Sequence, residues 1–265
     1  MPCFPHVVPE WNTNKGEGHM QTKPQHKGSA GRLPEDRICR MPAAIDPALL
    51  DRFEKLEDLT STVSDVLDKL GRVGVIGSSI LKPTLPQKRV IGRAITVRNI
   101  PQTRSVQQTI ADGANMMTEI EGIHQAETGD VLVIQGLRNL SNMGGVMATT
   151  CFYKGLAGAV VDGGIRDVGE SRGLGFPVWS RDISPISGKW RAETKEINGP
   201  VKIDGVPVEA GDLVIADETG VCFVPRDLIE QVLEACEAIA QTEQGWVEGL
   251  KNGMTVPELV AQLFK

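Results

Sequence analysis

The chain has 265 residues, of which 40% are hydrophobic and 23% charged, and its formal net charge is -6 at pH 7. This length and composition suit one large or two small globular domains. The acidic net charge excludes a global basic field of the kind that holds nucleic acid or an anionic membrane, so we expect neither as a partner.

The cysteine and histidine patterns narrow the compartment and the chemistry. The five cysteines show no C-x-x-C spacing and their number is odd, which argues against a complete disulfide framework. No apolar run approaches the roughly 20 residues of a membrane span, and the N-terminus lacks the apolar core of a secretory signal. We therefore expect a soluble, cytoplasmic protein. His124 is the only histidine after residue 30, so an H-E-x-x-H zinc site is excluded, and we expect His124 on a helix surface.

The first forty residues differ from the rest of the chain. They contain nine Gly or Pro and no periodic apolar pattern, which predicts a disordered or tag-like extension over residues 1–40. Gly18-His19-Met20 resembles a cloning scar, and either Met20 or Met41 could be a natural start. We expect a single folded domain over residues 41–265.

Two helices are predicted first. "DPALLDRFEKL", from Asp46, places a proline at the first helical position. "LTSTVSDVLDKLG" offers Thr60 or Ser61 as a cap, an apolar face, and a stop at Gly71.

A strand, a helix and a second strand follow. "RVIGRAITVRNI", residues 89–100, alternates in the manner of a half-buried strand. The segment from Thr109 to Gln125 has a helical pattern. "GDVLVIQG" contains a short apolar run bounded by glycines, which predicts a buried strand over Val131 to Ile134.

The centre of the chain predicts a β-α-β unit. "NMGGVMATTCFYKGLAGAVVDGG" contains a glycine loop, a helix, a glycine stop and a strand, and it follows the strand that ends near Ile134. Parallel strands joined by a crossover helix have this pattern.

Short strands and two helices complete the chain. "GPVKIDGVPVEAGDLVIADETGVCFVP" predicts three or four short strands. "RDLIEQVLEACEAIAQ" places Leu228, Val232, Ala235 and Ile239 on one helical face, and a last helix is expected near "VPELVAQLF". One layered α/β domain is the economical interpretation.

The glycine pair Gly144-Gly145 opens the predicted helix that ends at Lys154. Backbone N-H groups at a helix N-terminus are free, and the helix dipole adds roughly half a positive charge there, so a carboxylate or phosphate would fit. A plain tight turn is the alternative, because the segment is neither G-x-G-x-x-G nor a Walker loop.

Arg166 and Asp167 follow the next strand, in "AVVDGGIRDVGES". If the glycine pair converges with them, Arg166 could clamp a carboxylate or 2-oxo oxygen in a bidentate way. Asp167 could ligate Mg2+ or Mn2+, which often take one or two protein carboxylates and fill the other positions with water. The alternative is a surface ion pair, with Asp167 as the cap of the following helix.

The sequence resembles the RraA-like family. The resemblance rests on "GGVMATTCFYKGLAGAVVDGGIRDVGESRGLGFPVWSRDISP" and "GVPVEAGDLVIADETGVCFVP" and extends over roughly Leu59 to Leu263. That family includes metal-dependent (class II) 4-hydroxy-4-methyl-2-oxoglutarate/4-carboxy-4-hydroxy-2-oxoadipate aldolases and RraA regulators of ribonuclease E. The resemblance implies an α/β sandwich that assembles as a homotrimer or homohexamer, with sites between subunits. It also implies that a glutamate, matched here by Glu243, reaches the neighbouring subunit's site.

The resemblance assigns roles to five residues around the glycine pair. Arg166 is expected to bind the oxygens of a pyruvate-type 2-oxo acid, and Asp167 is expected to hold the Mg2+ or Mn2+ ion. The amides of Gly145, Val146 and Met147 are expected to take the substrate carboxylate.

One position departs from the family pattern. The aldolases carry an acidic residue twenty-one positions before the arginine, where this sequence has Gly145, whereas Glu170 keeps the R-D-x-x-E pattern. Decarboxylation asks less of a general base than aldol cleavage, so the glycine favours an oxaloacetate-decarboxylase-like activity. A Schiff base through Lys154 is a further option, although a lysine just before the helix-ending Gly155 is typical of a C-terminal dipole partner.

The leading hypothesis is therefore a divalent-metal-dependent carbon-carbon lyase, acting by retro-aldol cleavage or decarboxylation on a small 2-oxo acid. A metal and Arg166 would stabilise the pyruvate-type enolate that both reactions share. The alternative is a non-catalytic regulatory binding protein of the RraA type. We expect Trp179 to pack in the core, whereas Trp190, in the polar "SGKWRAE", could shape the site.

Overall fold

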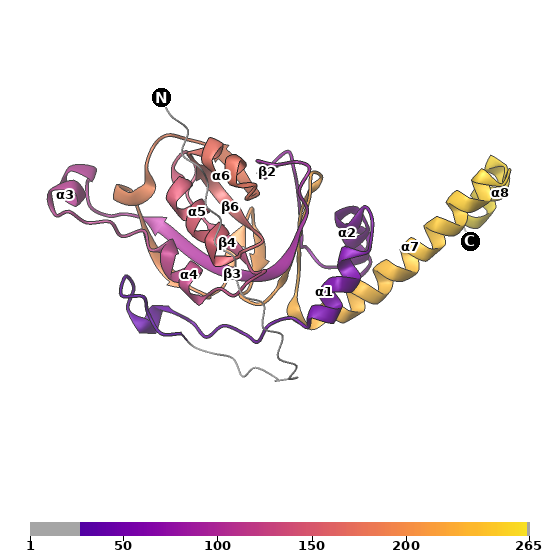
Figure 1. Ribbon diagram of the computed structural model, residues 1–265, viewed down its shortest axis with the longest axis horizontal. Helices are drawn as coiled ribbons and strands as arrows, with labels where there is room; N and C mark the ends of the chain where they lie inside the picture. The colour runs from indigo at the N-terminus through magenta and orange to yellow at the C-terminus, as the bar shows by residue number, and fades with distance from the viewer. Residues whose placement is uncertain (1–26, 264–265) are drawn as a thin grey trace, which may run out of the picture.

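Ten strands form one mixed sheet through the molecule, and two groups of helices pack against it (Figure 1). The structure is a computed structural model and describes residues 27–263. The strand order is β1-β12-β11-β3-β4-β6-β7-β2, with β5 beside β6 and β8 beside β3, while β9 and β10 form a separate hairpin. This arrangement confirms the expected layered α/β class.

The elements have the following bounds. The α-helices are α1 (Pro47–Glu54), α2 (Leu59–Lys69), α3 (Val106–Ala111), α4 (Glu119–Gln125), α5 (Gly145–Lys154), α6 (Val168–Leu174), α7 (Ile229–Lys251) and α8 (Val256–Leu263). The 3-10 helices are η1 (Glu35–Arg37), η2 (Gly188–Trp190) and η3 (Arg226–Leu228). The strands are β1 (Val75–Gly77), β2 (Lys82–Pro83), β3 (Val90–Pro101), β4 (Val131–Gln135), β5 (Ser141–Met143), β6 (Gly158–Ile165), β7 (Val178–Ile183), β8 (Ala192–Ile197), β9 (Val201–Ile203), β10 (Val206–Val208), β11 (Leu213–Ala216) and β12 (Gly220–Val224).

The centre of the sheet is parallel. β3 pairs with β4, β4 with β6, and β6 with β7, all in the same direction. The crossover from β4 to β6 runs through α5, so the predicted β-α-β unit is confirmed. β3 is buried over its first eight residues, not at every second one as expected. The reason is that apolar layers cover both faces of this strand: Ile95 and Val97 lie in one buried cluster, and Val90 and Ala94 lie in the other.

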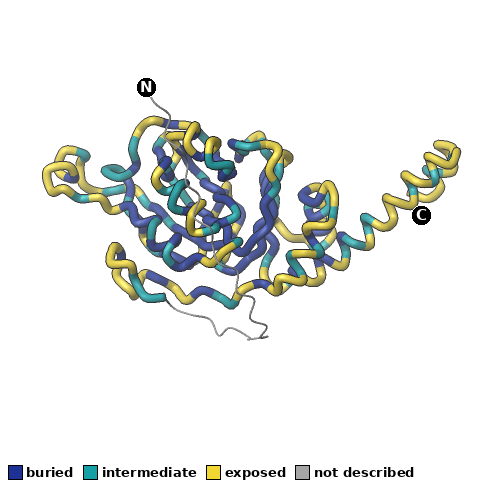
Figure 2. The backbone as a smooth tube through the Cα atoms, viewed as in Figure 1, coloured by how far each residue is buried: buried dark blue, intermediate teal, exposed yellow. Residues whose placement is uncertain are grey.

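Two apolar layers cover the faces of this parallel region. On one face α4, α5 and α6 pack over Ile95, Leu132 and Val161 (Figure 1). On the other face Val133 and Val160 meet the apolar residues of the β9-β10 hairpin. Figure 2 shows the resulting buried centre. Trp179 is fully buried in this second layer, as expected for a core residue.

A second group of helices packs beside β11 and β12. α1, α2 and the first half of α7 enclose a further apolar cluster with these strands. The rest of α7 and α8 extend away from the body as an arm (Figure 1). Within residues 27–263, no helix combines the length and the apolar character that a bilayer crossing requires.

Two predicted helices have different bounds in the structure. α2 begins at Leu59 after Asp58, whose φ of 44° is left-handed, so neither Thr60 nor Ser61 caps it. The single helix expected from Thr109 to Gln125 is instead two short helices, α3 and α4, separated by residues 112–118. Gly113 at φ 62° ends the first of them, because a left-handed residue stops a helix.

The described part of the expected extension packs against the domain. Leu33 and Ile38 lie in the core beside α4 and β8. The buried carboxylate of Glu121 accepts backbone N-H groups from Ala30 at 2.7 Å and Arg32 at 2.6 Å. Residues 27–40 therefore belong to the packed body, and the boundary expected at residue 40 does not separate them from it. The remainder of that expected extension, residues 1–26, lies outside the described residues.

Candidate active site

The short strand β5 brings the start of α5 beside Arg166 and Asp167. β5 pairs in parallel with the end of β6, and the Arg166 N-H donates to the Met143 carbonyl at 3.0 Å. α5 begins two residues after β5, at the same edge of the sheet. The convergence that the sequence left conditional is therefore present in the structure.

The double glycine of β6 permits this approach. A Cβ at Gly164 would lie 2.5 Å from the Leu140 carbonyl oxygen, and one at Gly163 would lie 2.8 Å from the Leu137 carbonyl oxygen. Any side chain would push the loop before β5 off the strand. The glycines thus serve close backbone packing, which in turn places Arg166 and Asp167 next to α5.

Asp167 joins the two segments. Its Oδ2 accepts the Gly145 N-H at 3.1 Å and lies 3.4 Å from Arg166 Nε. Both charged side chains are partly exposed, at 41% for Arg166 and 49% for Asp167. Asp167 precedes α6 but makes no side-chain cap to it, and its own φ is 56°. The ion pair of the alternative interpretation exists, whereas the cap does not.

Free backbone donors face this position. The first intrahelical bond of α5 runs from the Ala148 N-H to the Gly144 carbonyl, so the preceding N-H groups, those of Gly145, Val146 and Met147, have no helical partner. One of them, that of Gly145, is used by Asp167. The other two belong to residues that line a cavity of about 170 Å³. Since a water molecule takes about 30 Å³ of liquid, the cavity suits a small acid.

The cavity gathers most of the residues predicted from the sequence. Its lining includes Gly144, Gly145, Val146, Met147, Arg166 and Asp167. It also includes residues that the sequence analysis did not single out: Asn115, Met117, Glu119, Ser141, Asn142, Met143, Ser187 and Lys189. Lys189 lies 4.2 Å above the ring of Trp190, which links that tryptophan to the edge of the site. These additions come from segments 112–119 and 141–143 and from η2 with its preceding residue Ser187, none of which has a strong sequence signal.

Glu119 is the most unusual member of the lining. Its side chain is buried, and its Oε2 has no hydrogen-bond partner. Burial raises the pKa of its carboxyl from 4.5 to about 7, opposed only by a hydrogen bond from its own backbone N-H. A partly protonated carboxyl therefore lies in the same cavity as Arg166 near neutral pH.

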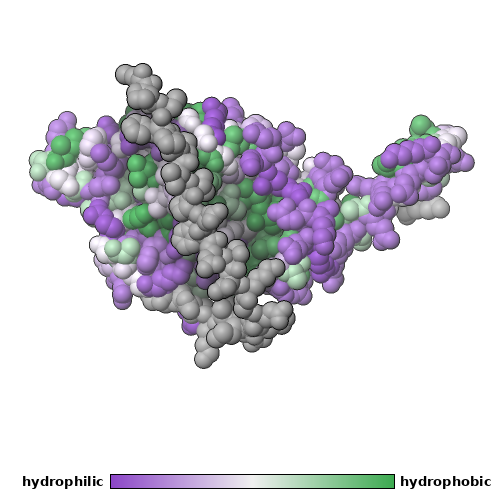
Figure 3. Space-filling model, in the orientation of Figure 1, coloured by the Kyte–Doolittle hydropathy of each residue, from purple (hydrophilic) through white to green (hydrophobic). Residues whose placement is uncertain are grey.

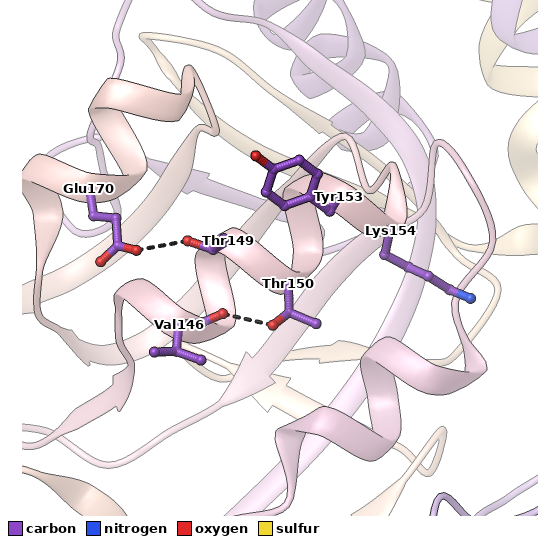
Figure 4. A pocket seen from close by; sticks show the side chains of 6 residues that line it. All are labelled: Val146, Thr149, Thr150, Tyr153, Lys154 and Glu170. Carbon is purple, nitrogen blue, oxygen red and sulfur yellow. Dashed lines mark hydrogen bonds between the residues drawn. The ribbon is translucent and has the colours of Figure 1, made fainter. Parts of the chain in front are cut away.

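Glu170 lies on the other side of Gly145, in a shallow hollow on the outer face of α5 (Figure 4). Its Oε1 accepts a hydrogen bond from Thr149 at 2.9 Å. Its other oxygen occupies the space where a side chain at position 145 would begin. Lys154 lines this hollow and not the cavity that holds Arg166, and it is the last residue of α5 before left-handed Gly155. That position agrees with a dipole partner and not with a Schiff-base lysine beside Arg166.

Glu243 lies elsewhere in the chain. It is on α7, in a groove that also contains Asp65, Lys69 and Trp246. The chain's own cavity does not include it. The prediction that it completes a neighbouring subunit's site therefore stays a prediction.

The donor set fits a hard divalent ion held mainly by water. No group of three or more His, Cys, Asp or Glu with metal-binding geometry occurs in the part of the chain that the structure describes. Mg2+ and Mn2+ accept sites with one or two protein carboxylates. The half-exposed carboxylate of Asp167, at the wall of the cavity, is compatible with such a site.

Comparisons with known proteins identify the family. A family model described as RraA-like (Aldolase/RraA) matches residues 60–223. The chain is 32% identical over 159 residues, 59% of its length and 70% of the relative, to a protein of Halalkalibacterium halodurans named "Putative 4-hydroxy-4-methyl-2-oxoglutarate aldolase".

Two solved structures share the fold. An uncharacterized protein from Pseudomonas syringae pv. tomato is 29% identical, with a TM-score of 0.68, over 82% of this chain and 98% of that one. RraAS2 of Streptomyces coelicolor, described as an unusual member of the RNase ES inhibitor RraA protein family, is 26% identical, with a TM-score of 0.65, over 77% of this chain and 97% of that one.

Proposed function

The chain belongs to the RraA-like family, Aldolase/RraA, and we propose that it is a carbon-carbon lyase that acts on a small 2-oxo acid in the cavity between α5 and Arg166. The name of the Halalkalibacterium halodurans relative supports an aldolase-type reaction. The observation that carries the proposal is the convergence of the α5 N-terminus with Arg166 and Asp167 around one small cavity.

Substrate binding follows from the charges in this cavity. The unpaired N-H groups of Val146 and Met147 and the dipole of α5 favour a carboxylate at the helix start. The Arg166 guanidinium can hold a carboxylate or the neighbouring 2-oxo oxygen through two parallel hydrogen bonds. Both interactions fix the 2-oxo acid end of the substrate and leave its other end toward the cavity wall.

Arg166 also contributes to the reaction itself. When the carbon-carbon bond breaks, negative charge develops on the 2-oxo oxygen as the enolate forms. A preorganised cation beside that oxygen stabilises the charge, and the loss of one such donor typically costs about 10²- to 10³-fold in kcat. Asp167, at 3.4 Å from Nε, holds the guanidinium in place.

Asp167 is also the residue that would hold Mg2+ or Mn2+. A bound divalent ion supplies a Lewis acid that polarises the 2-oxo group. The role of the chain is then to keep the carboxylate oriented, which the Gly145 N-H does through its hydrogen bond at 3.1 Å. We propose that the reaction depends on this divalent ion, which is the property that defines class II aldolases.

The choice between aldol cleavage and decarboxylation depends on proton handling. Aldol cleavage needs a base for the substrate hydroxyl, whereas decarboxylation releases carbon dioxide without one. At position 145, where the family aldolases carry an acidic residue, this chain has a glycine, which has no side chain to serve in proton transfer. We propose that the substrate is either a 4-hydroxy-2-oxo acid or oxaloacetate, and both should be tested.

The buried cysteines support a reducing, cytoplasmic setting. Cys151, Cys222 and Cys236 are buried as free thiols, and burial raises the pKa of Cys222 to about 12. Thiols held in this way are inert structural groups.

A regulatory binding protein is the second candidate. The Streptomyces coelicolor neighbour is described as a member of an inhibitor family, and Gly145 removes an acid from the cavity. In this case the same pocket would bind an acid without turning it over.

Pyruvate release decides between the two. Release from oxaloacetate and from 4-hydroxy-4-methyl-2-oxoglutarate should be measured with Mg2+ or Mn2+, with EDTA, and in Asp167→Asn and Arg166→Lys. We expect EDTA to abolish release and both variants to lower kcat by about 100-fold or more. Asp68→Asn, at an exposed position on α2, is the control and should behave like the parent. Pyruvate binding without release would favour the regulatory protein.

A further inference from the structure

Glu119 occupies a position that structural packing alone does not explain. It is the first residue of α4, it is buried, and it forms part of the wall of the cavity that contains Arg166 and Asp167. A buried carboxyl oxygen without a partner costs free energy, so such groups are rare unless they serve a ligand or a reaction.

A comparison with Glu121 makes the contrast clear. Glu121 lies two residues further along α4 and is also buried, but its carboxylate accepts hydrogen bonds from Ser29, Ala30, Arg32 and Leu33. Although burial alone would raise the pKa of Glu121, these donors lower it below its ordinary value. Glu121 is thus a structural carboxylate, whereas Oε2 of Glu119 has no donor at all.

The other acids near the cavity are already engaged. Asp167 accepts the Gly145 N-H and lies beside Arg166. Glu170 is bonded to Thr149 on the outer face of α5. Glu119 is therefore the acid in this lining that has a carboxyl oxygen without a hydrogen-bond partner.

The groups that surround Glu119 come from four directions. α5 contributes Cys151, whose pKa is raised by burial and further by the charge of Glu119. The lining contributes Arg166 and Asp167 after β6 and Lys189 in η2. β3 packs on α4 with apolar side chains, and β8 contributes the hydroxyl of Thr194, which accepts the Thr118 N-H at 2.7 Å.

We propose that Glu119 is the general base and acid of the lyase reaction on a 4-hydroxy-2-oxo acid. Its carboxylate takes the proton of the C4 hydroxyl while the C3-C4 bond breaks. The electron pair of that bond passes to the 2-oxo group as the enolate of pyruvate, and C4 leaves as a carbonyl. The Glu119 carboxyl then returns the same proton to C3, which gives pyruvate and restores the carboxylate. This inference rests on the proposed lyase function.

The test compares Glu119→Gln with the parent protein on two substrates between pH 5 and 9, with Mg2+ present. For 4-hydroxy-4-methyl-2-oxoglutarate, we expect kcat to fall at least 100-fold and the acidic limb of the pH profile to disappear, because general acid-base groups contribute about 10²- to 10⁴-fold. Carbon dioxide loss from oxaloacetate should fall far less, since that step removes no hydroxyl proton. In Glu119→Gln, the rate at which the pyruvate methyl protons exchange in D2O, followed by NMR, should fall together with the rate of aldol cleavage.

Three controls make the outcome unambiguous. Glu119→Asp should recover part of the exchange rate. Glu121→Gln should lower the melting temperature and leave the pH profile of kcat unchanged. Pyruvate affinity in Glu119→Gln, measured by calorimetry, should stay within a few-fold of the parent, which shows that the cavity is intact.

Each contrary result has a distinct meaning. If the parent releases pyruvate and Glu119→Gln keeps the parent's rate and pH profile, Glu119 is not the acid-base group, while the lyase function stands. If the parent neither releases pyruvate nor exchanges its methyl protons, the lyase function fails and the role of Glu119 fails with it.

Discussion

Gly145 and Glu170 share one small space at the start of α5. A Cβ at position 145 would meet the Glu170 carboxylate, which is the mobile end of a long side chain. We expect Gly145→Ala to displace that carboxylate and break its bond to Thr149, a loss of about 1 kcal/mol. Alanine recovers up to about 1 kcal/mol by its higher helix propensity, so the net change should be small.

A double-mutant cycle with Glu170→Ala, read by urea unfolding, checks this interpretation. In a Glu170→Ala background the added methyl group meets no carboxylate and only Asp167 Cβ remains close, at 3.1 Å, so Gly145→Ala should be more favourable there than in the parent. Additive effects of the two substitutions would contradict the shared space.

Glu119 predicts a pH dependence of stability. Its pKa is about 7 in the folded chain and 4.5 ordinarily, so the folded state binds more protons than the unfolded state between these values. The contribution of Glu119 to the free energy of unfolding is therefore greatest below about pH 4.5. It falls by about 3 kcal/mol as the pH rises through 7. We expect Glu119→Gln to gain stability relative to the parent across this range. Unfolding by urea at pH 5 and pH 8 measures it, and an equal difference at the two pH values would contradict the buried, unpaired carboxyl.

At the scale of elements, the contact between β6 and the loop before β5 positions the site. A Cβ at Gly164 would lie 2.5 Å from the Leu140 carbonyl, and backbone cannot move away as cheaply as a side chain. We expect Gly164→Ala to destabilise the protein by about 1–3 kcal/mol and to weaken pyruvate binding, because β5 carries the start of α5. Gly173→Ala, in α6 with open space around it, is the matched control and should be neutral or slightly stabilising. Calorimetry on both variants separates the two effects, and unchanged binding in Gly164→Ala would show that β5 does not set the site.

The same contact shows what the sequence could predict and what it could not. β4, α5 and β6 are apolar segments bounded by glycines, so local patterning suffices for the β-α-β unit. β5 has only three residues, Ser-Asn-Met, and pairs because distant glycines leave room for it. The position of Arg166 and Asp167 directly after a predicted strand identifies them as candidate site residues. Glu119 was missed, since an acid in a helical pattern normally faces solvent and its burial depends on segments far away in the sequence.

At the scale of the whole molecule, the arm formed by the second half of α7 and by α8 has no partner within the described chain. It leaves the body, and its free end carries hydrophobic residues (Figure 3). Five large apolar side chains along it are 43–68% exposed: Val247, Leu250, Val256, Val260 and Leu263. A set of exposed apolar residues on one element is typical of a protein-protein contact.

We propose that this arm packs against a second copy of the chain in a homotrimer or homohexamer. The resemblance to the family implies such an assembly, and Glu243 lies on the same helix, where it would approach a neighbour's cavity. We expect light scattering of the full chain to give three or six times the mass of one chain. Val256→Asp together with Val260→Asp should shift the mass toward one chain and reduce pyruvate release, because charges on an apolar contact oppose association. The matched control is Glu258→Gln in the same helix, which should keep the assembly. A monomeric parent with full lyase activity would show that the cavity of one chain is sufficient and that the arm serves another purpose.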